Sequence, residues 1–132
     1  MSATQRAMDL AQAAAAAASD KLAEHVSALD VSEQLALTDV FVIASAPNER
    51  QVDAIVDAVE ERLLQLKCKP LRREGRKESR WVLLDFGDIV VHVMHTEDRA
   101  FYDLERLWKD CPGIALDAVQ QQQQQQPAEP GR

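Results

Sequence analysis

A nearly unbroken apolar run, Ile89-Val90-Val91, places the strictest limit on the fold of this chain. Apolar residues at consecutive positions of a strand point to both faces of a sheet, so the strand needs cover on both sides. The run therefore predicts a sheet with helices packed on it.

Two segments are expected to form helices. Thr4–Lys21 contains good helix formers and neither Gly nor Pro. The second helix begins after Asn48, which with Gln51 resembles a capping box. Apolar residues then recur at helical spacing, at Val52, Ile55, Val56, Val59, Leu63 and Leu66.

Short β-like runs lie on both sides of the second helix. The predicted strands are Ala28–Val31, Val40–Ala44, Lys67–Leu71, Trp81–Leu84 and Ile89–His95. The first two are close enough in sequence for an antiparallel pair, and Asp85–Asp88 is short enough to turn the last two into a hairpin.

A last helix is expected over Glu97–Asp110, with one apolar stripe formed by Phe101, Leu104, Leu107 and Trp108. The order of elements implies a mixed β-sheet of about five strands flanked by helices, in the α/β or α+β class. We expect residues 1–117 to form one domain. Residues 118–132 contain seven consecutive glutamines and are predicted to be a disordered low-complexity tail.

Charge and composition exclude several classes of function. Fifteen basic against 22 acidic residues give a net charge of −7, which disfavours general DNA binding. The apolar run Ala11–Ala18 is too short to span a bilayer. Cys68 and Cys111 are isolated, so a reduced cytoplasmic protein without a disulfide framework is expected.

Two residue pairs are candidates for chemistry. Asp85 and Asp88 are a carboxylate pair of the kind that holds a metal ion in nucleotidyl transfer, but no Gly-containing phosphate loop precedes the second helix. His92 and His95 are three residues apart, which sends them to opposite faces of a strand and weakens a zinc site. Buried, hydrogen-bonded histidines are the favoured interpretation, and we expect no metal or cofactor.

A cluster of positive charge lies between the second helix and the hairpin. It comprises Arg72, Arg73, Arg76, Lys77 and Arg80 and reads as an exposed basic loop. Contact with rRNA phosphates and a simply solvated loop of mixed charge both stay open.

Two aromatic residues are candidates for a protein interface. Trp81 begins a strand, where it is either a contact residue at the sheet edge or a core residue. Tyr102 has charged neighbours and suits the rim of an interface, although a solvated helix face is the alternative.

Three segments together resemble the ribosomal silencing factor family, also called RsfS or Iojap. They are Leu29–Val31 with Thr38–Ser45 and Arg50–Val52, then Glu74-Gly75 with Trp81–Val93, and finally Arg99 with Tyr102–Trp108. The resemblance covers roughly Gln5 to Pro112. It places Glu74, Gly75, Trp81, Asp85, Gly87, Asp88, His92, Arg99, Tyr102, Asp103, Glu105 and Trp108 at signature positions.

The resemblance implies a binding protein and not an enzyme, with a nucleotidyltransferase-like fold that lacks the catalytic motif. Family members dock on large-subunit ribosomal protein fourteen, block joining of the subunits and lower translation when nutrients are scarce. Homodimers are known among them. The contact residues expected here are Trp81, Asp98, Arg99, Tyr102 and Glu105.

Two other functions compete with this interpretation. One is a metal-dependent nucleotidyltransferase-like enzyme that uses Asp85 and Asp88. The other is a homodimeric regulatory module in which Trp81 and Tyr102 are buried against a second copy.

Overall fold

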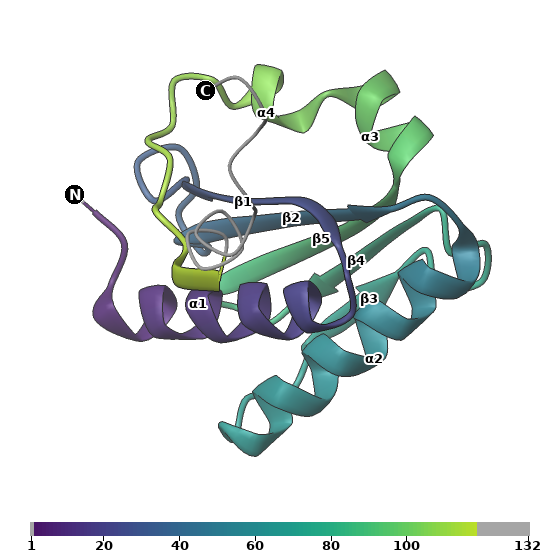
Figure 1. The fold of residues 1–132 in the computed structure, drawn as a ribbon. Coiled ribbons are helices and arrows are strands. Elements are labelled where there is room, and N and C mark those ends of the chain that lie inside the picture. Colours follow the sequence, from purple (N-terminus) through teal and green to yellow (C-terminus); the bar gives the residue numbers. More distant parts are fainter. Residues whose placement is uncertain (1, 119–132) are drawn as a thin grey trace, which may run out of the picture.

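The computed structural model describes residues 2–118, which fold into a single mixed sheet with helices on both faces (Figure 1). In chain order the elements are α1 Gln5–Asp20, β1 Glu24–Asp30, β2 Val40–Ala46, α2 Glu49–Gln65, β3 Arg72–Glu74, β4 Trp81–Asp85, β5 Ile89–His95, α3 Thr96–Tyr102 and α4 Leu104–Leu107. The described strands lie in the order β1-β2-β5-β4-β3, with β2 and β5 parallel and the other pairs antiparallel. The expected mixed sheet of about five strands is confirmed.

Helices α1 and α2 cover one face of the sheet (Figure 1). Each begins at a side-chain cap: Thr4 accepts a hydrogen bond from the Ala7 amide, and Asn48 accepts one from the Gln51 amide. Their apolar faces pack with residues of the strands into the larger core cluster. The small alanine side chains of α1 let this helix approach the sheet and α2 closely, so this face of the sheet is buried beneath the two helices.

The other face carries only the short helices α3 and α4 (Figure 1). A smaller core cluster lies beneath them, formed by Leu29, Val31, Phe41, Ile43, Val90, Met94, Leu104 and Cys111. None of the residues of α3 is buried, and Leu104 is the buried residue of α4. This face is therefore covered less completely than the α1/α2 face.

The predicted single helix over Glu97–Asp110 is wrong. The chain breaks at Asp103, which adopts a left-handed conformation with φ +48° and separates α3 from α4. The break changes the helical register, so the expected stripe does not form. Leu104 still reaches the core, but Phe101 and Leu107 are 81% and 72% exposed.

Two strand boundaries also differ from the sequence prediction. Lys67–Leu71 is not a strand, because Lys67 has φ +62° directly after α2 and Pro70 has no amide to donate. Pairing with β4 begins instead at Arg72. Strand β1 begins at Glu24, four residues before the expected start, and contains a bulge between Glu24 and Ser27.

Two further findings concern membrane-spanning helices and the predicted C-terminal tail. Within residues 2–118, no helix is long and apolar enough to cross a bilayer. The tail expected over 118–132 lies, from residue 119 onward, outside the described residues.

Replacing Gly75 with Ala should disturb the connection between β3 and β4, residues 75–80. Gly75 has φ +85°, and a Cβ atom there would lie 1.9 Å from the carbonyl oxygen of Trp81. We expect Gly75→Ala to lower the free energy of unfolding by at least about 2 kcal/mol, measured by urea denaturation. Gly113→Ala is the matched control, because nothing lies within 4 Å of the added Cβ. Equal stability of the two variants would contradict this account of the turn.

Candidate docking surface

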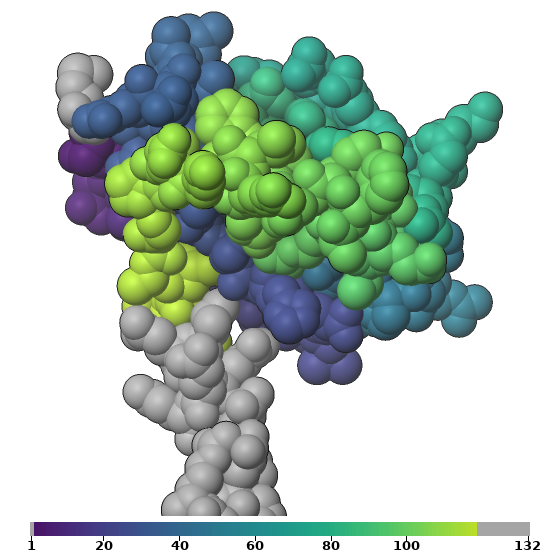
Figure 2. All heavy atoms as spheres, turned by 90° about the horizontal axis from the view of Figure 1, so that it is seen from above, coloured from purple at the N-terminus to yellow at the C-terminus, as the bar shows by residue number. Residues whose placement is uncertain are grey.

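Exposed aromatic and aliphatic side chains gather on the thinly covered side of the sheet. We call this surface the α3 face and define it by Trp81, Phe101, Tyr102, Leu107 and Trp108. Figure 2 looks onto this side, where the green residues of α3 and α4 form the centre of the surface. Tyr102 is 46% exposed, whereas Trp81 and Trp108 are half-buried.

The rings of the α3 face contact one another. The Tyr102 ring lies 4.9 Å from that of Trp81 and 5.0 Å from that of Phe101, between ring centroids. Trp108 packs edge-on against Phe41 of the smaller core at 5.1 Å. The His92 ring, 4.9 Å from Phe41 and 6.1 Å from Trp81 between centroids, connects the two groups, so ring contacts run from the core to the most exposed ring, Phe101.

Trp81 is also fixed from inside. Its indole N–H donates a hydrogen bond of 3.1 Å to Nδ1 of His92, which is only 5% exposed. Burial lowers the pKa of His92 to about 4, so the ring is neutral and can accept this bond at neutral pH. The structure combines the two alternatives for Trp81: the side chain packs against the smaller core cluster, and part of it is exposed at the surface.

Arg99 holds α3 against β1 and β2. Its side chain is 11% exposed, and its guanidinium donates hydrogen bonds to the backbone oxygen of Glu24 and to the hydroxyls of Ser27 and Ser45. It also forms an ion pair with Glu105. Burial by itself raises the pKa of Glu105, but the hydrogen bond and charge of Arg99 outweigh burial and lower the pKa below its ordinary value.

A second ion-pair system connects α3 with α2. Arg80 pairs with Asp98 of α3 and, at 3.3 Å, with Glu49 at the start of α2. Asp98, Arg99 and Glu105, all expected to contact a partner, therefore each have partners within the chain. Trp81 and Tyr102, by contrast, keep exposed surface that a partner can contact.

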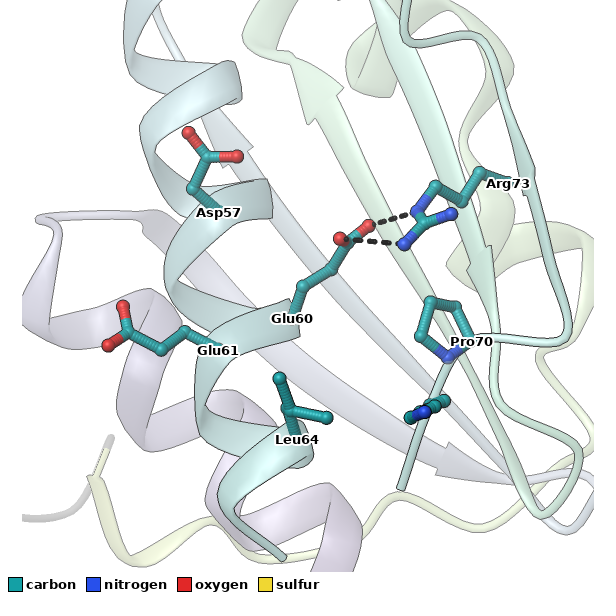
Figure 3. A pocket seen from close by; sticks show the side chains of 7 residues that line it. Asp57, Glu60, Glu61, Leu64, Pro70 and Arg73 are labelled. Carbon is teal, nitrogen blue, oxygen red and sulfur yellow. Dashed lines mark hydrogen bonds and ion pairs between the residues drawn. The ribbon is translucent and has the colours of Figure 1, made fainter. Parts of the chain in front are cut away.

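The basic segment is not simply a solvated loop. It includes β3, and Arg73, Arg76 and Arg80 pair with carboxylates of α2. Arg73 forms two hydrogen bonds with Glu60, of 2.7 and 3.2 Å, across a groove between α2 and β3 (Figure 3). Arg76 pairs with Asp57 at 2.6 Å and with Asp53.

Two members of the segment differ. Arg72 lies 3.9 Å from Glu74 in a largely exposed pair. Lys77 forms no ion pair with another residue in the described part of the chain. Most of the positive charge of the basic segment is therefore balanced by nearby carboxylates.

The candidate residues for metal chemistry have structural roles here. Asp85 accepts a hydrogen bond of 2.9 Å from the Gly87 amide and so shapes the β4–β5 turn. His95 caps α3 by accepting the Glu97 amide at Nδ1. Over residues 2–118 no group of three or more His, Cys, Asp or Glu side chains is arranged to hold a metal ion.

Sequence reasoning missed part of this surface. The spacing of Phe101 and Leu107 predicts that both lie on the apolar stripe of one helix, but the break at Asp103 leaves both side chains exposed. Nothing in the local sequence signals that break. The resemblance places His92 at a signature position. Its hydrogen bond to Trp81 does not follow from the sequence, because it depends on the register of β4 with β5.

Comparisons with known proteins agree with the resemblance. The sequence model of the family described as "Ribosomal silencing factor during starvation" matches residues 4–132. Ribosomal silencing factor RsfS of Halalkalibacterium halodurans is 40% identical over 111 residues, which cover 84% of this chain and 95% of that protein. A crystal structure of a Chromobacterium violaceum protein is similar with a TM-score of 0.75 and 32% identity, covering 84% of this chain and 93% of that one.

A eukaryotic relative extends the comparison. The mouse protein named "Mitochondrial assembly of ribosomal large subunit protein 1" is 34% identical over 89 residues, covering 65% of this chain and 39% of that protein.

Acidification should weaken the fold through His92. Its pKa is 6.5 when unperturbed and about 4 in the folded chain, so between these values the unfolded chain binds more protons and stability falls with falling pH. The loss should reach about 3 kcal/mol by pH 4. Urea denaturation of the wild type and His92→Asn at several pH values checks this, because the variant should lack this component. Parallel curves would contradict it.

Shortening the Arg99 clamp should loosen α3. A lysine at this position offers one ammonium group and cannot serve both serines, the Glu24 backbone and Glu105 together. We expect Arg99→Lys to speed amide hydrogen exchange in α3 and to lower stability by about 1 to 3 kcal/mol. The exposed Arg106 provides the control, since Arg106→Lys should leave exchange in α3 unchanged. Unchanged exchange in both variants would show that Arg99 does not hold α3.

Proposed function

Because this chain belongs to the ribosomal silencing factor family, we propose that it binds the large ribosomal subunit through the α3 face and prevents the small subunit from joining. Membership supports a ribosome-associated silencing role. The choice of surface depends on one observation: Phe101 and Tyr102 of α3 and Leu107 of α4 are exposed, and both helices lie on the thinly covered side of the sheet (Figure 2). Aromatic side chains are enriched at the centres of protein interfaces, and a monomer gains no stability from exposing them.

The proposed partner on the subunit is large-subunit ribosomal protein fourteen. Residues 96–111 contain five acidic and three basic side chains, and the whole chain has a net charge of −7. Such a surface is attracted to a basic ribosomal protein. The name of the mouse relative refers to the large ribosomal subunit, which supports the large subunit as the binding partner.

The side chains divide into two groups in this proposal. Trp81 and Tyr102 contact the partner, together with Phe101. Asp98, Arg99 and Glu105 act mainly by holding α3 in place, because their charged groups already have partners within the chain.

Contact between the basic segment and rRNA stays a prediction. Arg73, Arg76 and Arg80 would have to exchange carboxylate partners for phosphates, whereas Lys77 is free to bind without such an exchange. A homodimer and a cytoplasmic location also stay predictions.

We propose that silencing needs no catalysis. The competing nucleotidyltransferase-like function depends on Asp85, whose carboxylate already accepts a hydrogen bond within the β4–β5 turn, and on the exposed Asp88. Release of pyrophosphate from nucleoside triphosphates with Mg²⁺, abolished by Asp88→Asn, would favour the enzyme instead.

Truncation of the exposed rings should weaken docking without unfolding the chain. We expect Phe101→Ala and Tyr102→Ala each to reduce affinity for purified large subunits about tenfold or more, because each removes a contact ring with little loss of core. Affinity is measured by co-sedimentation, and for isolated ribosomal protein fourteen by titration calorimetry. Leu64→Ala, at an exposed position on α2, is the control. Wild-type binding by both ring variants would exclude the α3 face.

The bound protein should also compete with the small subunit. Mixing purified subunits with a saturating amount of the wild-type protein should lower the yield of joined ribosomes in light scattering, and Tyr102→Ala should restore the yield. If joining proceeds equally with and without the protein while the large subunit is occupied, silencing does not act by blocking joining.

A further inference from the structure

His92 is a buried polar residue that the docking proposal does not yet use. Its Nε2 atom is buried and has no hydrogen-bond partner among the described residues. Buried polar side-chain atoms usually have a partner, so an unsatisfied one calls for an explanation. An unpaired buried N–H lowers the stability of the fold, so the other contacts of the ring have to account for its presence here.

The register of the sheet shows what the ring does. Leu83 of β4 pairs with His92, and Trp81 pairs with Met94, so Trp81 and His92 are diagonal neighbours on one face of the sheet. The Trp81 indole N–H donates to His92 Nδ1 at 3.1 Å. Because Nδ1 accepts, the neutral ring carries its proton on Nε2, and this N–H is the buried group that has no acceptor among the described residues.

Other rings fix His92 and Trp81 in turn. Phe41 packs edge-on against the imidazole, with 4.9 Å between ring centroids, and the Tyr102 ring lies 4.9 Å from the indole. Trp81 is thus held between a buried acceptor and an exposed ring. Without that acceptor the indole N–H would be left unpaired in its present orientation, and pairing it with water would require the ring that Tyr102 packs on to turn.

We propose that His92 is a positioning residue for docking: its Nδ1 fixes the orientation of Trp81, so that Trp81 and Tyr102 meet the ribosomal partner already in binding geometry. The inference rests on the proposed docking function of the α3 face. Fixing side chains before association raises affinity, because less conformational freedom is lost on binding.

Two substitutions separate the hydrogen bond from the bulk of the ring. His92→Phe keeps a ring but removes the acceptor, and His92→Asn offers a carbonyl oxygen close to the place of Nδ1. In ¹H–¹⁵N spectra the indole signal of Trp81 should shift strongly in His92→Phe and little in His92→Asn, with Trp108 as the internal reference. Affinity for purified large subunits should fall about fivefold in His92→Phe and be retained in His92→Asn.

Several results would overturn the proposal. An unmoved Trp81 signal in His92→Phe would show that the bond does not set the indole environment. A shifted signal with wild-type affinity, or a loss of affinity in a folded His92→Asn as large as that in His92→Phe, would show that His92 is merely structural.

If His92→Phe does not fold, His92→Leu, which also lacks an acceptor for the Trp81 N–H, replaces it in both measurements. It should also lower affinity about fivefold, and wild-type affinity would overturn the proposal. The proposed function can fail separately: if the wild-type protein does not bind large subunits, docking and positioning both fall, while the indole shift still reports whether the bond exists.

Discussion

The unequal cover of the two faces of the sheet is the constraint on which the rest of the structure depends. Strands β2 and β5 are parallel neighbours, yet the chain leaves β2 into α2 on one face and leaves β5 into α3 on the other (Figure 1). Helices of 16 and 17 residues seal the first face, whereas helices of 7 and 4 residues lie on the second. Aromatic side chains that α3 does not bury are therefore available for a partner.

Polar contacts do the work that apolar burial does not do for α3. A helix without a buried side chain gains little from the hydrophobic effect, so its place depends on the His95 cap, the Arg99 clamp and the pair between Asp98 and Arg80. The same contacts occupy the charged groups of Asp98, Arg99 and Glu105. In the proposed function, docking therefore depends on the exposed rings, with net negative charge as a longer-range attraction.

Much of the fold follows from periodicity and end signals. Thr4 and Asn48 stand where caps are needed, and the apolar runs of β2 and β5 mark the central strands. What local sequence could not show depends on long-range contacts: the turn at Asp103 and the pairing of Arg73 and Arg76 with α2. The candidate contact residues were predicted from the resemblance, whose family is confirmed. The local sequence predicted an exposed basic loop, but not the carboxylate partners of Arg73 and Arg76 on α2.

The most direct test of the central claim is site-specific crosslinking to intact large subunits. A photoreactive phenylalanine analogue placed at Phe101 on the α3 face, or at Leu64 on α2, reports which side lies against the ribosome. We expect the probe at Phe101 to crosslink to a large-subunit protein and the probe at Leu64 to give no such product. Crosslinks from Leu64 with none from Phe101 would contradict the claim that the thinly covered face is the docking surface.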